Sequence, residues 1–263
     1  MSIPAIYSNS GPLLAAIIVC TVVRAPAIAL VGGAQLAQGN IARQIVMVEN
    51  ARGAHCTGTL LARDIVLTAA HCLSGMAGLT VYTRTDTGTE GRKAISVALH
   101  PQYDAGSYAR AQATVDLALL KLELPLPEPW PVVIRRRVPL PGERFAIAGF
   151  GAAASRPSAG LDALQTATLI VAGEPSSLQL RLVDPVSRGG AIPGLGSCDG
   201  DSGGPVFAWS GRRLVLMGIL SWSNGPSMST GCGGISGATP LARHREWIVK
   251  TAREIGGKTN LVK

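Results

Sequence analysis

Short runs of apolar residues, separated by Gly, Pro, Ser and Asn, follow one another along most of the chain after Leu30. The runs hold five to ten residues and are rich in Val, Ile, Leu and Thr, which is typical of β-strands. No repeat of fixed period is visible. Short strands with frequent turns predict an all-β protein, built as barrels or sandwiches. The clearest predicted strands are Gln44–Val48, Thr59–Thr68, Thr114–Leu122, Arg144–Ala148, Ala163–Val171 and Arg213–Ser221.

Two segments differ from this pattern. Prolines are densest in the range Pro125–Pro141, near the middle of the chain. Because proline is excluded from helix interiors and central strands, this stretch is predicted to connect two halves. Near the C-terminus, apolar residues recur at roughly helical spacing and predict a helix that packs on the rest of the protein. These residues are Leu241, Trp247, Ile248 and Ile255.

The N-terminal segment predicts export. Leu13–Val23 is an apolar run of eleven positions, too short to cross a bilayer as a helix, which takes roughly 20 residues. The small residues of Ala27–Ala29 follow, in the pattern that signal peptidase accepts, so we expect cleavage directly before Leu30. No Lys or Arg precedes Leu13, which leaves an uncleaved membrane anchor or a cytoplasmic start as alternatives.

Composition narrows the class of protein. The chain has 263 residues, of which 47% are hydrophobic and 15% are charged, with 32 Gly and 17 Pro. A sizeable core can form and wholesale disorder is excluded, while the low charge and abundant Gly and Pro favour a β-rich protein over a helical bundle or coiled coil. The length suits one large domain or two small barrels that share a cleft. The formal net charge of +8 favours anionic surfaces, but no clustered basic stripe supports nucleic-acid binding.

The cysteine count agrees with export. The chain has 5 cysteines, and removal of the signal segment discards Cys20, which leaves 5 − 1 = 4. An even number of cysteines in an exported protein indicates disulfides. Neither Cys-x-x-Cys nor His-Glu-x-x-His spacing occurs, so disulfides are favoured over metal ligands and no metal site is predicted.

Three segments contain the residue types of nucleophilic catalysis. Thr68–Cys72 ends an apolar run and contains His71, and Asp116–Leu120 begins another run with a carboxylate. Gly200–Pro205 places Ser202 among glycines. Each has an ordinary explanation by itself, as a packed histidine, a turn cap or a turn. Together they favour catalysis, because a serine hydroxyl needs a base and that base needs an orienting acid.

With these segments the sequence resembles the trypsin/chymotrypsin family of serine proteases, over Leu30–Ile255. The resemblance implies an all-β fold of two six-stranded antiparallel β-barrels, with the active site in the cleft between them and a C-terminal helix. The implied domains are a signal peptide at 1–29 and a trypsin-like peptidase domain at 30–263. Within the latter, the barrels would cover about 42–130 and 131–240, and the helix about 241–256. Further anchors are Leu30–Gly33, Cys56 through Cys72, Ala148–Gly151, Cys198–Pro205, Ser221–Trp222 and Arg245–Ile248.

The resemblance also assigns catalytic roles. His71 takes the proton of the Ser202 hydroxyl and later gives it to the leaving amine, while Asp116 fixes the imidazole tautomer. The backbone N–H groups of Gly200 and Ser202 form the oxyanion hole. Glycine suits this loop because a Cβ would obstruct a close approach of the backbone. Ser221 braces Asp116.

Substrate-binding residues follow in the same way. Gly196 stands at the floor of the specificity pocket, where family members that cut after Lys or Arg carry an aspartate, and Ser223 and Gly237 form its walls. We therefore expect uncharged apolar side chains, from medium aliphatic to aromatic, before the scissile bond. The segment expected to pair with the substrate backbone as an added strand comprises Ser221, Trp222 and Ser223.

Two disulfides and an ion pair complete the implied set. The disulfides are Cys56–Cys72 and Cys198–Cys232. The ion pair joins a new amino terminus to the aspartate before the nucleophile, which here would be Leu30 and Asp201. Since the predicted signal-peptidase cut falls directly before Leu30, export itself would produce the active enzyme. Trimming by a second protease is the alternative.

These observations predict a secreted or periplasmic serine endopeptidase that hydrolyses peptide bonds through an acyl-enzyme. Peptide or protein substrates and protein inhibitors are the expected partners. No cofactor, metal, nucleic acid or stable membrane anchor is expected, and the chain is expected to be a monomer. A catalytically silent protease-like binding protein is the alternative, which retention of the whole triad disfavours. An esterase would show Gly-x-Ser-x-Gly and the order Ser-Asp-His, and the sequence has neither.

Overall fold

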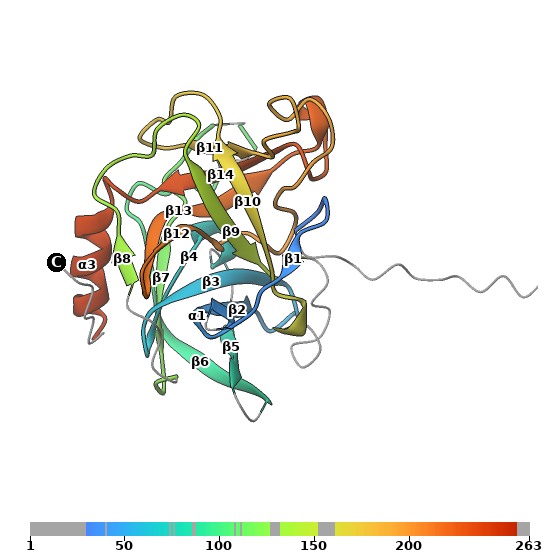
Figure 1. Ribbon diagram of the computed structural model, residues 1–263. Helices are drawn as coiled ribbons and strands as arrows, with labels where there is room; N and C mark the ends of the chain where they lie inside the picture. The colour runs from blue at the N-terminus through green and yellow to red at the C-terminus, as the bar shows by residue number, and fades with distance from the viewer. Residues whose placement is uncertain are drawn as a thin grey trace, which may run out of the picture.

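The computed structural model describes residues 30–39, 41–73, 75, 77–85, 88–107, 109–110, 112–126, 132–151 and 161–256. The expected signal segment, residues 1–29, lies outside them, and the proline-rich connector is described in part. Figure 1 shows two groups of strands, β2–β7 and β9–β14, with helix α3 at the left edge of the view. No helix among the described residues has the length and hydropathy needed to cross a membrane.

Six antiparallel strands close the first barrel in the order β2-β3-β4-β7-β6-β5, with β5 pairing back onto β2. β4 lies between β3 and β7 and is buried along its whole length. β6 alternates between exposed and half-buried positions, as a strand with one solvated face does. The short helix α1 (Ile41–Gln44) precedes the barrel. The strands of the first barrel are β2 (Ile45–Glu49), β3 (His55–Ala62), β4 (Ile65–Thr68), β5 (Thr80–Thr85), β6 (Gly88–Leu99) and β7 (Ala118–Leu122).

The second barrel closes through β9-β10-β11-β14-β13-β12, because β9 pairs with both β10 and β12. β1 (Gln35–Leu36) adds to β10, and β8 (Val132–Ile134) adds in parallel to β13. The predicted fold class, two six-stranded antiparallel barrels with a C-terminal helix, is confirmed. The second set of strands is β9 (Arg144–Gly149), β10 (Gln165–Val171), β11 (Leu180–Val183), β12 (Pro205–Ser210), β13 (Arg213–Ser223) and β14 (Ile235–Pro240).

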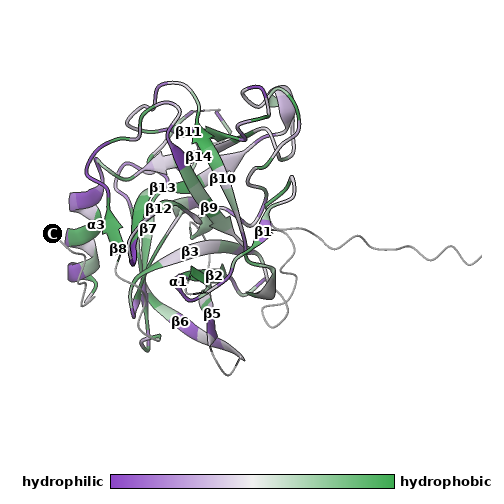
Figure 2. Ribbon diagram, viewed as in Figure 1, coloured by the Kyte–Doolittle hydropathy of each residue, from purple (hydrophilic) through white to green (hydrophobic). Residues whose placement is uncertain are grey.

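The two barrels share packed apolar residues. One core cluster extends from the first barrel to Phe207 of β12, Leu216 of β13 and Ile248 of the helix α3 (Arg245–Glu254). A second cluster fills the second barrel around residues such as Ile147 and Leu169. Figure 2 shows hydrophobic strands inside the molecule and both hydrophobic and hydrophilic residues on α3. This shared packing fixes the position of one barrel against the other.

The prediction of one continuous strand at Thr59–Thr68 is wrong. The apolar run Thr59–Thr68 is a hairpin, in which β3 and β4 are joined by a turn at Arg63 and Asp64. The turn carbonyls accept hydrogen bonds from the backbone, Arg63 O from Leu126 and Asp64 O from Leu122. Apolar residues flank the turn on both sides because both strands are buried, so hydropathy alone does not reveal the reversal.

Two histidines meet where the end of β6 packs against the start of α3. His100 and His244 are both buried, and His244 Nδ1 lies 3.2 Å from His100 Nε2. The His100 ring packs edge-on against the Trp247 ring, with 4.5 Å between the ring centroids. Burial, with a smaller contribution from His244, lowers the pKa of His100 to about 4. The imidazole is therefore neutral in the folded protein at neutral pH.

This pair predicts a loss of stability in acid. The unfolded chain binds a proton at His100 near the ordinary pKa of 6.5, and the folded chain binds it near 4. The free energy of unfolding therefore falls as the pH drops from about 6.5 towards 4. In His100→Gln the same fall is shallower, as urea denaturation at pH 7, 6 and 5 will measure. Equal slopes for the two proteins would contradict this prediction.

Candidate active site

The paired strands β4 and β7 bring a histidine and an aspartate together. Thr68 at the end of β4 lies opposite Ala118 at the start of β7. His71 follows β4 in the 3₁₀ turn η1 (Ala70–Cys72), and Asp116 lies two residues before β7. Because the strands are antiparallel, the chain leaves β4 and enters β7 at the same end of the barrel, so the two residues become neighbours.

Asp116 is buried, with 3% of its surface exposed, and its carboxylate accepts three hydrogen bonds. Oδ1 accepts the backbone N–H of His71 at 2.9 Å, while Oδ2 lies 2.6 Å from His71 Nδ1. The Ser221 hydroxyl, from the second barrel, donates to Oδ2 at 2.6 Å. Burial acts to raise the pKa of Asp116, but the bonds from His71 and Ser221 outweigh it and hold the pKa below its usual value. The carboxylate therefore stays charged and holds one tautomer of His71.

Ser202 lies in the loop before β12, and backbone bonds hold that loop in place. Gly203 N donates to Leu220 O at 2.8 Å, and Leu220 N donates to Gly204 O at 2.8 Å. A Cβ on Gly203, where φ is +84°, would overlap Thr57 O, so a side chain there would displace the loop. Ser202 thus lies at the junction of both barrels.

His71, Asp116 and Ser202 line one groove of about 1030 Å³. The His71 side chain is 40% exposed, so its ring is open to a bound molecule. Among the described residues, the Ser202 hydroxyl makes no hydrogen bond to the imidazole. Such catalytic contacts often shorten only when substrate is bound.

The Gly200 backbone has the conformation that glycine permits. Its φ is +88°, and a Cβ there would overlap Gly151 O. Its carbonyl is turned inward, where it accepts the Thr57 hydroxyl at 2.9 Å. The backbone N–H groups of Gly200 and Ser202 donate no hydrogen bond to any described residue.

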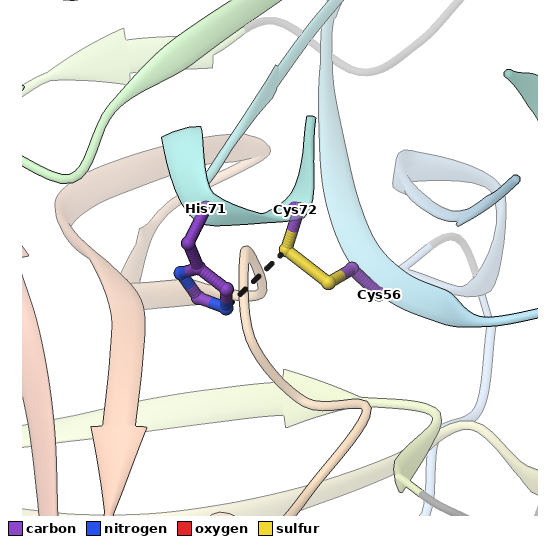
Figure 3. Close-up of side chains that lie close together, drawn as sticks. All are labelled: Cys56, His71 and Cys72. Atoms are coloured by element: carbon purple, nitrogen blue, oxygen red, sulfur yellow. Dashed lines mark hydrogen bonds between the residues drawn. A yellow bond between two sulfur atoms is a disulfide. The ribbon is translucent and has the colours of Figure 1, made fainter. Parts of the chain in front are cut away.

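Figure 3 shows the His71 ring beside the Cys56–Cys72 disulfide. Nε2 lies 3.7 Å from Cys72 Sγ, and the potential ligand atoms of these three residues lie within 4.8 Å of one another. Disulfide sulfurs are not thiolates, so this group lacks the soft anionic ligands of a metal site. The bridge instead ties η1 to β3 next to the histidine. The second disulfide, Cys198–Cys232, connects the serine loop to the segment before β14.

Asp201, next to Ser202, is completely buried. Its Oδ1 accepts Gly151 N at 2.9 Å and its Oδ2 accepts Cys198 N at 2.8 Å. Burial raises the pKa of Asp201 to about 7, although both backbone bonds act in the opposite direction. Leu30 is also completely buried, and its neighbour Val31 donates to Gly196 O at 3.0 Å. Among the described residues no cation forms an ion pair with Asp201, so a nearby positive charge would stabilise the ionised form of this buried carboxyl group.

Two of the expected pocket residues, Gly196 and Gly237, have different surroundings. A Cβ built on Gly196 would point at Gly233 Cα, 3.1 Å away, and at Ser236 Oγ, 3.4 Å away. Ser236 therefore lies beside Gly196. Gly237 lies one residue further along β14, where a Cβ would overlap the Trp222 indole. Successive strand residues point to opposite faces, which is why a shift of one residue exchanges them.

The comparison with known families decides the assignment. The sequence model of the family described as Trypsin matches residues 30–248. The chain belongs to the trypsin family. It is similar to kallikrein-15 of Homo sapiens, with 29% identity over 231 residues, or 80% of this chain and 86% of that protein. It is also similar to a trypsin-like protease of Streptomyces glaucescens, with 32% identity over 187 residues, or 66% of this chain and 67% of that protein.

Membership of the trypsin family confirms the prediction of a serine-type endopeptidase whose substrates are proteins. One residue of this trypsin-family chain was missed by sequence reasoning. Thr57 of β3 is completely buried, donates its N–H to Ser202 O at 2.8 Å, and accepts Phe150 N at its hydroxyl at 3.2 Å. The available signal was a polar residue directly after Cys56 in an apolar strand. Thr57 links the serine loop to the first barrel.

Proposed function

We propose that this protein is an exported serine endopeptidase that cleaves peptide bonds through an acyl-enzyme on Ser202. The observation that carries the proposal is the chain of hydrogen bonds from Ser221 to Asp116 to His71, at the groove that Ser202 lines. The peptidase domain would comprise residues 30–263 and the signal peptide residues 1–29.

The proposed reaction starts at the His71 ring. Its Nδ1 is bonded to Asp116, so the neutral ring offers Nε2 as the base for the Ser202 hydroxyl. As the hydroxyl oxygen attacks the carbonyl carbon, its proton passes to Nε2, and the Asp116 charge stabilises the imidazolium. The proton then passes to the amine of the leaving peptide. A water molecule then attacks the ester carbonyl of the acyl-enzyme while His71 takes its proton. The proton returns to the Ser202 oxygen as the second product leaves.

Two further groups act on the substrate. The N–H groups of Gly200 and Ser202 would stabilise the oxyanion, a contribution typically worth about 10²–10³ in rate for one donor. The end of β13, at Ser221–Ser223, lines the groove with polar backbone that an extended substrate can pair with. Such pairing would hold the scissile carbonyl at Ser202.

We propose that the residue before the scissile bond is uncharged. Gly196 provides no carboxylate for a Lys or Arg side chain, and Gly233 and Ser236 fill the direction that a floor side chain would take. Ser223 and Ser236, rather than Gly237, are the wall residues in this proposal.

The amino terminus created by export would complete the site. Leu30 is buried and Val31 is bonded to Gly196, so the segment is already packed in the second barrel. Cleavage before Leu30 creates an ammonium group there, and Asp201 is a buried acid whose charged form a nearby cation would favour. That pair would hold the backbone of Gly200 and Ser202.

The test compares a chain that begins at Leu30 with one that retains Ala29. Both are incubated with an unfolded protein, and new amino termini are identified by mass spectrometry. We expect cleavage by the Leu30 form and at least about 10-fold less by the Ala29 form, since one extra residue displaces the ammonium group from Asp201. Equal rates would contradict the role of the terminus. Binding of the unfolded protein by the Leu30 form without any cleavage would support the silent binding protein instead.

A further inference from the structure

One buried hydroxyl in the groove has no protein partner. Ser197 lines the groove and is 3% exposed, and its Oγ makes no hydrogen bond within the described residues. The backbone of Ser197 is fixed, since its N–H donates to Ser236 Oγ at 2.8 Å. Buried polar atoms in folded proteins nearly always have partners, so this hydroxyl requires an explanation.

Ser236 supplies a second hydroxyl at the same place. Its Oγ accepts the Ser197 N–H, which leaves its own proton available for donation. Ser236 is 1% exposed and lies beside Gly196 and Gly233, neither of which has a side chain. Two hydroxyl groups therefore stand together where Gly196 has no side chain, one on the groove-lining Ser197 and one on its neighbour Ser236.

We propose that Ser197 and Ser236 select a carboxamide side chain, glutamine or asparagine, at the residue before the scissile bond. The proposal rests on the proposed function and narrows its uncharged class. A carboxamide oxygen accepts a bond from one serine hydroxyl while its NH₂ group donates to the other, and serine can take either role. An apolar side chain of the same size would leave the Ser197 hydroxyl buried without a partner and would offer no acceptor to the Ser236 proton.

Charged side chains fit this pocket less well. A carboxylate would be buried beside Ser197 and Ser236, neither of which is charged, and Asp199, an exposed acid that lines the groove together with Arg181, adds a like charge. A Lys or Arg side chain would be buried without a carboxylate at Gly196. A carboxamide is neutral, so its burial does not incur the cost of burying an unpaired charge.

The first test uses four peptides that are identical except at the residue before the scissile bond, which is Gln, Met, Glu or Lys. Met has nearly the shape of Gln without its polar tip. The Leu30 form should cleave the Gln peptide with a kcat/KM about 10- to 100-fold above that for Met, and further above those for Glu and Lys. A Met peptide cleaved as fast as Gln or faster would overturn the carboxamide proposal and leave the endopeptidase intact. If the protein cleaves none of the four peptides and does not cleave an unfolded protein either, both the carboxamide proposal and the endopeptidase proposal are overturned.

The second test is Ser197→Ala, with Ser210→Ala as matched control because Ser210 is an exposed serine at the end of β12. The Gln-to-Met ratio of kcat/KM should fall towards one in Ser197→Ala, through a higher KM for Gln, and stay unchanged in the control. The Tm of Ser197→Ala should equal or exceed that of the parent, because a buried hydroxyl without a partner is removed. An unchanged ratio in Ser197→Ala, or a lower Tm with proportional losses for Gln and Met, would show a structural role and overturn the proposal.

Discussion

Ser202→Ala lowers kcat for peptide hydrolysis by about 10⁴–10⁶-fold, the largest loss expected for any single substitution in this protein. The alanine removes the attacking oxygen and keeps the backbone contacts of the loop, including the bond from Thr57 N to Ser202 O. We therefore expect binding of a peptide substrate and the Tm to change little. Activity is measured on the best peptide substrate with mature protein beginning at Leu30.

The exposed Ser210 again provides the control, since Ser210→Ala removes a hydroxyl outside the groove. It should retain full activity. A Ser202→Ala protein with more than a hundredth of the parent activity would show that another group attacks the peptide bond.

Asp116→Asn is expected to lower kcat by about 10⁴-fold with the fold intact. The asparagine amide has one oxygen for three donors, the His71 backbone, His71 Nδ1 and the Ser221 hydroxyl, whereas the carboxylate serves them with two. Its NH₂ group would face Nδ1 and favour the tautomer that protonates Nε2, which can no longer accept the Ser202 proton. The imidazolium would also lose the charge that stabilises it.

Ser221→Ala is expected to lower kcat less than Asp116→Asn does. It removes one of the three bonds to Asp116 and keeps the carboxylate, so a loss of about 10-fold in kcat is expected, on the scale of one hydrogen bond to a charged group. Steady-state kinetics on the same substrate measures both variants. A loss of less than 10-fold in Asp116→Asn would contradict the role given to the carboxylate.

Much of the fold could be predicted from local pattern. The runs at Arg144–Ala148 and Arg213–Ser221 correspond to β9 and β13 within two residues, because each is bounded by turn residues and buried on at least one face. Thr114–Leu122 was predicted as one strand, but pairing in β7 begins at Ala118. The four residues before it, which include Asp116, have no regular secondary structure. Strand ends depend on the partner strand, which a local pattern does not contain.

Some features of the site could likewise be predicted from the sequence, and others depend on contacts between distant residues. The order of His71, Asp116 and Ser202 in the chain was sufficient to suggest their chemistry, and the structure brings all three to one groove. The bonds of Thr57 and the place of Ser236 depend on residues far apart in sequence. Gly237 and Ser236 differ by one position on a strand, and only the register with β13 decides which of them lies beside Gly196.

The most direct test of the central claim is the trapping of the nucleophile. The chain beginning at Leu30 is treated with an organofluorophosphonate, and the labelled residue is mapped by mass spectrometry after digestion. A single adduct on Ser202 is predicted, with labelling abolished in Ser202→Ala and strongly slowed in His71→Ala, where the base is missing. No adduct on Ser202 in correctly processed, folded protein, or equal labelling of another serine in Ser202→Ala, would contradict a serine protease mechanism at this site.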